Sequence, residues 1–266
     1  MKYKLIVSDV DGTLVDKNRI LTERTVSAVK RAIAAGALFA LATGRAKQGI
    51  KDIADRLGIC DTPQIIYNGA MAVWGDKTLF SLSIDKDLAK RTVEEGHKRH
   101  STMICWCDHK LYCEETGKKE KIDFYKTISG VEPIVLSSLH DVCDKGVTKI
   151  LWIDDEIKTP VYLSEMNDIL GDRLNIVTSR RDFLEFMNKS ASKGAALKAV
   201  SEKLGISLKD CVAIGDGLND LSMMEIAGTS VAMESAADIV KNACTFVTKD
   251  SDHDGVAEFL EKHVLS

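Results

Sequence analysis

Short apolar runs alternate with amphipathic segments through the first eighty residues, and this alternation most constrains how the chain can fold. The runs Leu5–Val7 and Ala37–Ala42 predict two buried strands. Between them, Thr22 is placed to cap a helix that Gly36 ends. A second amphipathic segment leads to the strand-like run Gln64–Tyr67. Strand, helix, strand, helix, strand at this spacing is typical of a parallel sheet with crossover helices.

The middle of the chain has a different pattern. It predicts a helix over 86–99, a hairpin that turns at Asp108-His109, a polar helix, a strand over 149–153, another helix, and short strands near Ile176 and Leu184. After Ser192 the first pattern returns, with helices over 193–204 and 219–226, a strand over 211–214, and a final helix that ends near His263. We therefore expect an α/β protein with a Rossmann-like parallel-sheet core (residues 1–82 plus 188–266) and an inserted α+β domain (residues 83–187).

Composition excludes several classes of protein. The net charge of −4 leaves no electrostatic footprint for nucleic acid. The longest apolar run, residues 34–42, is interrupted at Gly36 and is too short to span a bilayer. The N-terminus predicts a strand almost at once, with no signal peptide. Seven cysteines, an odd number, favour reduced thiols, so we expect a cytoplasmic protein that binds neither nucleic acid nor membrane.

Polar residues follow four of the predicted strands at the point where each strand ends. These segments are Asp9-Val10-Asp11-Gly12-Thr13, Thr43-Gly44-Arg45, Asn68-Gly69 and Gly215-Asp216-Gly217-Leu218-Asn219-Asp220. Any one of them alone is an ordinary turn. A calcium loop of the EF-hand type is excluded, because Ile20 holds the position that needs a glutamate. Ligands bind beyond the carboxyl ends of parallel strands, so the four segments and Lys193 together predict one site.

The segments DVDGTL, ATGR, SKG and GDGLND resemble the four-motif signature of the haloacid dehalogenase superfamily of phosphatases. The segment IIYNGA and the closing pattern VAMESAADIVKNACTFVTKDSDHDGVAEFL resemble the Cof-type subfamily. One departure is visible, since relatives typically read AMGNA where this chain has Ala232-Met233-Glu234-Ser235-Ala236. The resemblance implies that residues 83–187 form a cap that closes over the core and contacts the leaving group.

The first motif carries the reaction that this resemblance implies. Asp9 is the predicted nucleophile, which attacks phosphorus and forms an aspartyl-phosphate. Asp11 is expected to protonate the leaving alkoxide and then to deprotonate the attacking water. Because a carboxylate and an anionic phosphate repel each other, Mg²⁺ is predicted to bridge Asp9, the backbone carbonyl of Asp11 and the carboxylate of Asp216.

The predicted phosphoryl-binding groups come from several loops. They are the backbone amides of Val10 and Gly44 and the side chains of Thr43, Lys193 and Asn219. Asp220 is expected to support Lys193 or a metal-bound water. The resemblance implies sugar phosphates or phosphorylated cofactors, such as flavin mononucleotide or pyridoxal phosphate, as substrates. The candidate substrate contacts are Arg45, Asn68, Arg180, Arg181, Asn188 and Lys189.

Two other functions use the same residues differently. A phosphomutase would form the same aspartyl-phosphate but return the phosphoryl group to a sugar instead of to water. A metabolite-binding regulator would keep the fold without turnover, although a pure binder has little need for the nucleophile Asp9. The sequence carries no signal for an oligomeric state.

A zinc site in the inserted domain is a further alternative. Cys105 and Cys107 share one face of a predicted strand, and the turn that contains His109 could bring Cys113 across to them. The spacing matches no standard pair of zinc-binding cysteines, so a half-buried hairpin that happens to contain thiols is the favoured interpretation.

Overall fold

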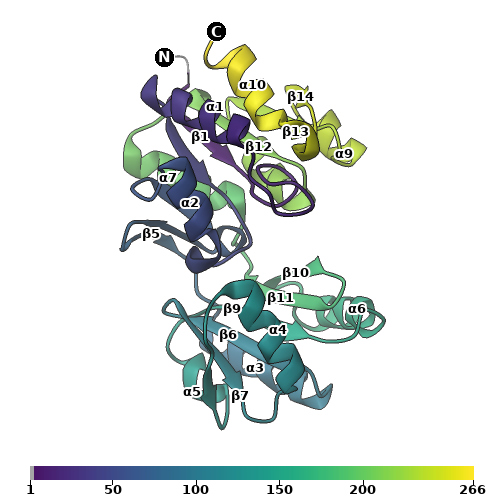
Figure 1. Ribbon diagram of the computed structural model, residues 1–266. Coiled ribbons are helices and arrows are strands. Elements are labelled where there is room, and N and C mark those ends of the chain that lie inside the picture. The colour runs from purple at the N-terminus through teal and green to yellow at the C-terminus, as the bar shows by residue number, and fades with distance from the viewer. Residues whose placement is uncertain (1–2) are drawn as a thin grey trace. The chain divides into compact units, whose positions relative to one another are not determined.

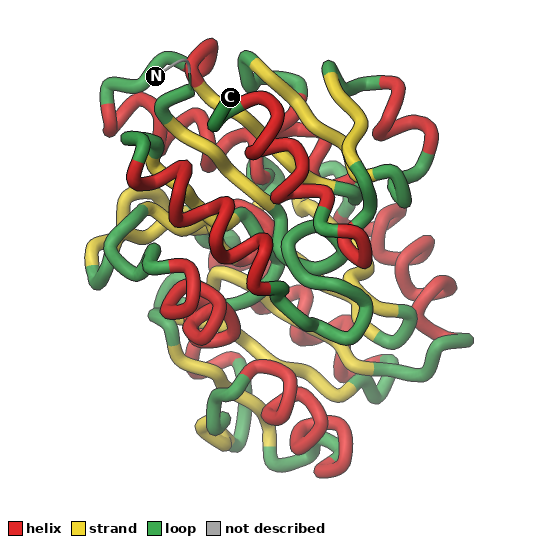
Figure 2. The backbone as a smooth tube through the Cα atoms, turned by 45° about the horizontal axis from the view of Figure 1, so that its top comes forward, coloured by secondary structure: helices red, strands yellow, loops and turns green. Residues whose placement is uncertain are grey.

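The structure is a computed structural model that describes residues 3–266, and it divides into two compact units (Figure 1). The first unit contains the described residues up to Gly44, together with Ile50–Phe80 and Ser192–Ser266. The second contains Arg45–Gly49 and Ser81–Ala191. Each unit has its own sheet with helices packed against it (Figure 2). Within residues 3–266, no helix is both long and apolar enough to cross a bilayer.

A five-stranded parallel sheet forms the centre of the first unit, with strand order β14-β13-β12-β1-β2. Its strands are β1 (Leu5–Ser8), β2 (Leu38–Leu41), β12 (Cys211–Gly215), β13 (Thr229–Met233) and β14 (Phe246–Thr248). Leu5 pairs with Cys211 on one side and with Leu38 on the other, so the N-terminal strand lies inside the sheet. The predicted parallel core is confirmed for the strands β1, β2 and β12.

Helices pack on this sheet through apolar side chains. They are α1 (Glu23–Ala34), α2 (Lys51–Leu57), α7 (Lys193–Leu204), α8 (Leu221–Met224), α9 (Asp238–Asn242) and α10 (Gly255–His263). Helix α1 lies beside α2 and α10, and α7 lies beside α8. Leu5 and Val7 share one apolar cluster with Leu197 of α7. Thr22 caps α1 by accepting a hydrogen bond from the backbone N–H of Thr25, as predicted.

The third strand departs from the prediction. Strand β3 (Pro63–Ile66) does not extend the parallel sheet; it pairs antiparallel with β4 (Met71–Trp74), which is followed by β5 (Lys77–Ser81) in a separate three-stranded sheet. A single parallel bridge, between Ala42 and Ile65, joins β3 to the end of β2.

Two buried side chains explain why β3 leaves the parallel sheet. The side chain of Gln64 accepts a hydrogen bond from the backbone N–H of Leu41 at 2.9 Å, and Thr62 donates to the carbonyl of Phe39 at 2.7 Å. Backbone groups at the edge of β2 are therefore satisfied by side chains, where a neighbouring strand would otherwise satisfy them.

Short helical turns interrupt several connections. They are the 3-10 turns η1 (Lys47–Ile50), η2 (Tyr67–Gly69), η3 (Leu208–Asp210), η4 (Leu218–Asp220) and η5 (Ser251–His253). The helix expected over 219–226 is instead the turn η4 followed by α8. This division keeps the polar residues of η4 outside the regular helix, in the loop that follows β12.

The second unit is an α+β unit built on a six-stranded sheet of order β10-β11-β9-β6-β7-β8. Its strands are β6 (Thr102–Cys107), β7 (Lys110–Glu114), β8 (Ile134–Leu136), β9 (Val147–Ile153), β10 (Leu174–Arg180) and β11 (Phe183–Asn188). Its helices are α3 (Lys86–Lys98), α4 (Lys119–Ser129), α5 (His140–Cys143) and α6 (Lys158–Leu170). Strand β8 and helix α5 carry no clear periodicity and were not predicted.

The register of the β6–β7 hairpin excludes a zinc site that uses Cys105, Cys107 and Cys113 together. It turns at Asp108 and His109, which both have positive φ, as a two-residue hairpin loop requires. Cys113 pairs with Ile104, and paired residues point to the same face of a sheet, so Cys113 faces away from Cys105 and Cys107. The zinc alternative is therefore wrong in its geometry.

Candidate active site

The loop after β1 places Asp9 at the end of a buried strand. The Asp9 side chain is buried, and its backbone N–H donates to the carbonyl of Ile214 on β12 at 2.9 Å. The carbonyl of Val10 accepts backbone hydrogen bonds from Leu14 and Val15, which closes the loop tightly. Asp11 lies at the exposed side of this loop. One loop therefore presents a buried carboxylate and an exposed one two residues apart.

Gly12 allows this loop to approach the loop that follows β12. Its φ is +83°, and a Cβ atom at this position would lie 2.7 Å from Oδ2 of Asp216. Thr13 then donates from its hydroxyl to Oδ1 of Asp216 at 2.8 Å. The sequence analysis predicts no role for Thr13. Its position just after Asp9 and Asp11 was the one feature that could have indicated this role. The pair Gly12-Thr13 thus fixes Asp216 beside the first motif.

Lys193 opens helix α7 and is 1% exposed. Ser192 caps the helix, with its side chain accepting from the backbone N–H of Ala195. The Lys193 ammonium donates to Oδ1 of Asp9 at 2.6 Å and to Oδ1 of Asp220 at 2.5 Å. Burial lowers the pKa of Lys193, but the charges of Asp9 and Asp220 more than compensate and raise it above its ordinary value. The lysine is therefore held charged between two acids.

Asp220 organises the loop after β12 as well as Lys193. Its second oxygen accepts from the backbone N–H groups of Asp216 at 3.0 Å and Gly217 at 2.9 Å. A Cβ atom on Gly215 would lie 2.4 Å from the Asp220 carboxylate, so this approach requires glycine. The supporting contact predicted from Asp220 to Lys193 is present in the structure.

Three carboxylates gather at this point. Each of Asp9, Asp216 and Asp220 offers an oxygen, and these oxygens lie within 4.8 Å of one another. Burial raises the pKa of Asp9 to about 8, with the Lys193 charge offsetting part of that rise, and burial also raises the pKa of Asp216. One ammonium cannot balance three carboxylates, and hard oxygen donors suit a divalent cation such as Mg²⁺. The donor set therefore fits a metal ion.

The remaining predicted phosphoryl-binding residues lie in neighbouring loops of the first unit. Thr43 is buried, and its backbone N–H donates to the carbonyl of Ile65 at 2.9 Å. Asn68 packs against Gly44, since a Cβ atom on Gly44 would lie 3.0 Å from the Asn68 side-chain oxygen. The exposed Asn219 donates from its amide to that same oxygen at 3.1 Å. The third and fourth segments are therefore in direct contact.

The predicted substrate contacts in the second unit have structural partners. The side chain of Asn188 donates to the carbonyl of Ser83 at 2.8 Å and accepts from the N–H of Ser190, which joins the two segments that enter and leave the unit. Lys189 donates to the carbonyl of Gly171. Their predicted roles in substrate binding stay predictions.

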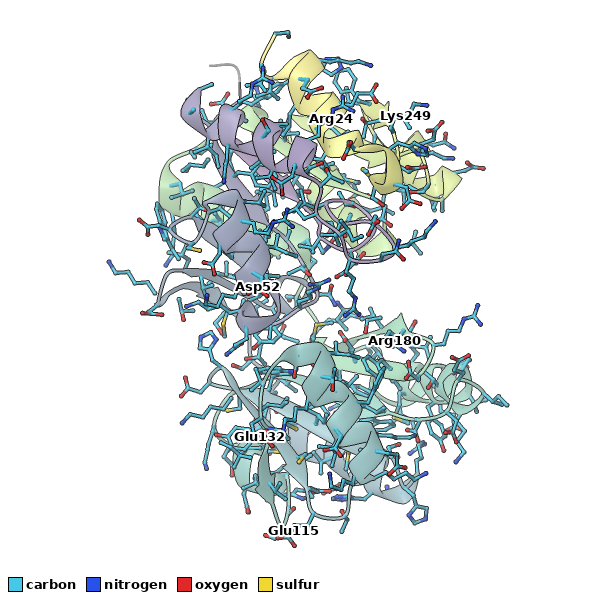
Figure 3. The ribbon with its side chains drawn as sticks, viewed as in Figure 1. Arg24, Asp52, Glu115, Glu132, Arg180 and Lys249 are labelled. Atoms are coloured by element: carbon cyan, nitrogen blue, oxygen red, sulfur yellow. The ribbon has the colours of Figure 1, made fainter. Side chains whose placement is uncertain are left out.

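The three arginines predicted to contact substrate also belong to the second unit. Arg45 donates to the carbonyl of Gly49 at 3.0 Å. Arg180 ends β10 (Figure 3), where its guanidinium lies 5.0 Å from the ring centroid of Phe124. Arg181 is exposed, 3.8 Å from Glu156. A substrate role for any of them stays a prediction.

Comparison with known proteins agrees with this arrangement. The family model of the haloacid dehalogenase-like hydrolases matches residues 6–260. The chain belongs to this family. The 5-amino-6-(5-phospho-D-ribitylamino)uracil phosphatase YwtE of Bacillus subtilis (strain 168) is 30% identical over 285 residues, covering 97% of each protein. This haloacid dehalogenase-like hydrolase is accordingly a phosphatase of the Cof type, as its motifs predict.

Solved structures place the fold in the same family. A haloacid dehalogenase-like hydrolase from Bacteroides thetaiotaomicron is 27% identical with a TM-score of 0.88, covering 98% of this chain and 99% of that chain. A Thermotoga maritima protein is 29% identical with a TM-score of 0.86, covering 98% and 97%. A haloacid dehalogenase subclass IIB sugar phosphatase shares the fold at 24% identity and a TM-score of 0.82, covering 97% and 98%.

Proposed function

We propose that this hydrolase is a Mg²⁺-dependent phosphatase that transfers the phosphoryl group of a small phosphorylated metabolite to Asp9 and then to water. The observation that carries the proposal is the ion pair between Asp9 and Lys193 at 2.6 Å, inside a cluster of three carboxylates. A buried carboxylate with one ammonium partner and a metal-binding neighbour is suited to attack an anionic phosphate, because its charge and that of the phosphate are offset.

In the first step, an oxygen of Asp9 forms a bond to phosphorus while the bond from phosphorus to the leaving oxygen breaks. Asp11 gives its proton to that oxygen, and an alcohol leaves. In the second step, Asp11 takes a proton from water, the water oxygen bonds to phosphorus, and the bond to Asp9 breaks to release phosphate. Lys193, Thr43, Asn219 and the amides of Val10 and Gly44 hold the phosphoryl oxygens in both steps.

The residues that would hold Mg²⁺ are Asp9, Asp216 and the backbone carbonyl of Asp11. When bound, the ion supplies positive charge that offsets the repulsion between the carboxylate and the phosphate. Thr13 keeps the Asp216 carboxylate oriented through its hydroxyl, and Asp220 does the same for Lys193.

The substrate class is proposed from relatives and remains broad. YwtE is named as a phosphatase of a phosphorylated ribitylamino-uracil, and another relative of the same fold as a sugar phosphatase. We propose a sugar phosphate or a phosphorylated cofactor for this chain, with the second unit acting as the cap that contacts its organic part.

A panel of phosphorylated metabolites, assayed for phosphate release with Mg²⁺ and with EDTA, tests the proposal. Asp9→Asn should lower kcat by at least about 10³-fold, because an amide is a far weaker nucleophile than a carboxylate. Asp52→Asn on α2 is the matched control, since Asp52 is an exposed aspartate (Figure 3) and should leave kcat unchanged. Equal activity of Asp9→Asn and wild type would show that Asp9 is not the nucleophile.

The same assay separates the phosphatase from a phosphomutase. A phosphatase releases phosphate steadily without any added sugar bisphosphate, because water accepts the phosphoryl group. Phosphate release that required a bisphosphate, accompanied by conversion of one sugar phosphate into an isomer, would favour the mutase.

A further inference from the structure

The turn formed by Tyr67, Asn68 and Gly69 lies against three loops of the proposed site. The backbone N–H of Asn68 donates to the carbonyl of Thr43 at 2.9 Å. The Asn219 amide donates to the Asn68 side-chain oxygen at 3.1 Å. Gly69 is so close to the start of α7 that a Cβ atom there would lie 2.0 Å from the Ser192 carbonyl oxygen. One short turn therefore meets the second, third and fourth motifs.

The backbone of this turn is strained. Tyr67, Asn68 and Gly69 have φ values of 52°, 53° and 86°, so three consecutive residues are left-handed, and two of them carry side chains. All three are buried. Such a conformation persists only where the surrounding structure holds it, and it is concentrated at functional sites.

The Asn68 side chain lies between two groups that hold phosphoryl oxygens in the proposed mechanism. Its amide packs closely on Gly44. A Cβ atom on that glycine would lie 3.0 Å from Oδ1 and 3.2 Å from Nδ2 of Asn68. Its oxygen accepts one of the two amide hydrogens of Asn219, which leaves the second hydrogen for a phosphoryl oxygen. Asn68 itself is only 7% exposed.

We propose that Asn68 is a positioning residue, which sets the Thr43-Gly44 loop and the Asn219 amide for a phosphoryl group. The proposal rests on the proposed function, and it replaces the expectation that Asn68 contacts the organic part of the substrate. It also gives the Asn-Gly pair of the third segment a role that a turn alone does not require.

The test uses a substitution that keeps the backbone. Asn68→Gly removes the amide, while glycine adopts a left-handed φ at no steric cost. The probe is orthophosphate in the presence of Mg²⁺, with its Kd measured by calorimetry on the full chain. We expect Asn68→Gly to weaken phosphate binding roughly tenfold, about what one well-placed hydrogen bond supplies. An unchanged Kd in a folded Asn68→Gly protein overturns the proposal.

A double-mutant cycle shows whether Asn68 acts through Asn219. Asn219→Ala should weaken phosphate binding in the wild type but have less than about a twofold further effect in Asn68→Gly. In Asn68→Asp, which keeps an acceptor and tolerates the left-handed backbone, Asn219→Ala should retain its full effect, and the cycle cancels the influence of the added charge. Equal effects of Asn219→Ala in the wild type and in Asn68→Gly overturn the proposal.

Turnover separates positioning from direct substrate contact. A positioning residue lowers kcat/KM by a similar factor for phosphate esters with small and large organic groups, whereas a contact to the organic group changes that factor from ester to ester. An ester-dependent effect overturns the positioning role. Phosphate binding needs no turnover, so the two proposals can fail independently. Full activity of Asp9→Asn would overturn the proposed function but not this inference. An unchanged Kd of Asn68→Gly for phosphate would overturn this inference but not the proposed function.

Discussion

Each unit of this hydrolase buries a lysine against carboxylates, and the two sites differ in charge balance. In the first unit, Lys193 contacts Asp9 and Asp220, with the Asp216 carboxylate close by. In the second unit, Lys149 is 2% exposed and donates to Glu185 at 3.1 Å. The first site holds three carboxylates for one ammonium, and the second pairs one carboxylate with one ammonium.

The two sites also differ in how the chain assembles them. Lys149 and Glu185 lie on the neighbouring strands β9 and β11, two positions apart in register, so one sheet face brings them together. Ser179 donates to the same Glu185 oxygen at 2.7 Å. Asp9, Lys193 and Asp220 come instead from two loops and a helix start far apart in the sequence. A balanced pair within one sheet leaves no net buried charge, whereas the unbalanced cluster at the strand ends fits the cation and the anionic substrate that we propose.

The largest expected effect separates the two lysines by activity. Lys193→Met should lower kcat/KM by at least about 10³-fold, because it removes the ammonium that contacts Asp9 and that we propose to hold the phosphoryl oxygens. Lys149→Met should keep kcat within about threefold of wild type, provided that circular dichroism shows a folded protein at the assay temperature. Comparable losses in both variants would break the comparison.

The second effect separates them by stability. Lys149→Met should lower the free energy of unfolding by about 3–5 kcal/mol, because it leaves the Glu185 carboxylate buried without its partner. The double variant Lys149→Met/Glu185→Leu should recover most of this loss, since no charge is then buried. Urea unfolding, followed by probes in each unit, measures both values. If the double variant were no more stable than Lys149→Met, the unpaired charge of Glu185 would not be the cause of the loss, and this interpretation of the Lys149–Glu185 pair would be wrong.

A third effect concerns the metal. Mg²⁺ at about a hundred times its Kd should raise the free energy of unfolding by about 2.7 kcal/mol, because in the proposed function it binds the folded carboxylate cluster and not the unfolded chain. Thermal unfolding with Mg²⁺ and with EDTA measures this shift without any substrate. Asp216→Asn should remove most of the shift, while the exposed control Asp52→Asn should keep it. A shift of equal size in both variants would place the cation elsewhere.

The smallest effect is the pH dependence of the balanced pair. Burial lowers the pKa of Lys149, but the charge of Glu185 and hydrogen bonds to Glu185 and Tyr125 raise it, on balance, above 10.5. A lysine whose folded pKa exceeds its unfolded pKa stabilises the fold fully below the unfolded value and loses that contribution as pH rises through the folded value. The stability difference between wild type and Lys149→Met should therefore be constant from pH 7 to 9 and shrink above pH 10.5. A constant difference up to pH 11 would contradict this assignment.

Much of this architecture could be predicted because its signals are local. Apolar periodicity and the cap at Thr22 were sufficient for the strands β1, β2 and β12 and for the helices α1, α2, α7 and α10 around them, and the predicted turn at Asp108-His109 is present. The convergence of Asp9, Lys193 and Asp216 followed from a general rule, since parallel strands direct their carboxyl ends to one edge. Strands β4, β5, β8, β13 and β14 and helices α5 and α9 were not predicted, because each has only three to five residues and carries no clear periodicity.

The sequence by itself therefore determined the strands β1, β2 and β12 with the helices between them, and which polar residues stand at the strand ends. Only the tertiary structure decided that β3 leaves the parallel sheet, that Cys113 faces away from Cys105, that Lys149 pairs with Glu185, and that Asn68 joins Gly44 to Asn219. Periodicity and capping act over a few residues along the chain. Strand register, the hydrogen bonds of a sheet edge and the partners of a buried charge depend on residues far apart in sequence, which meet only when the chain has packed.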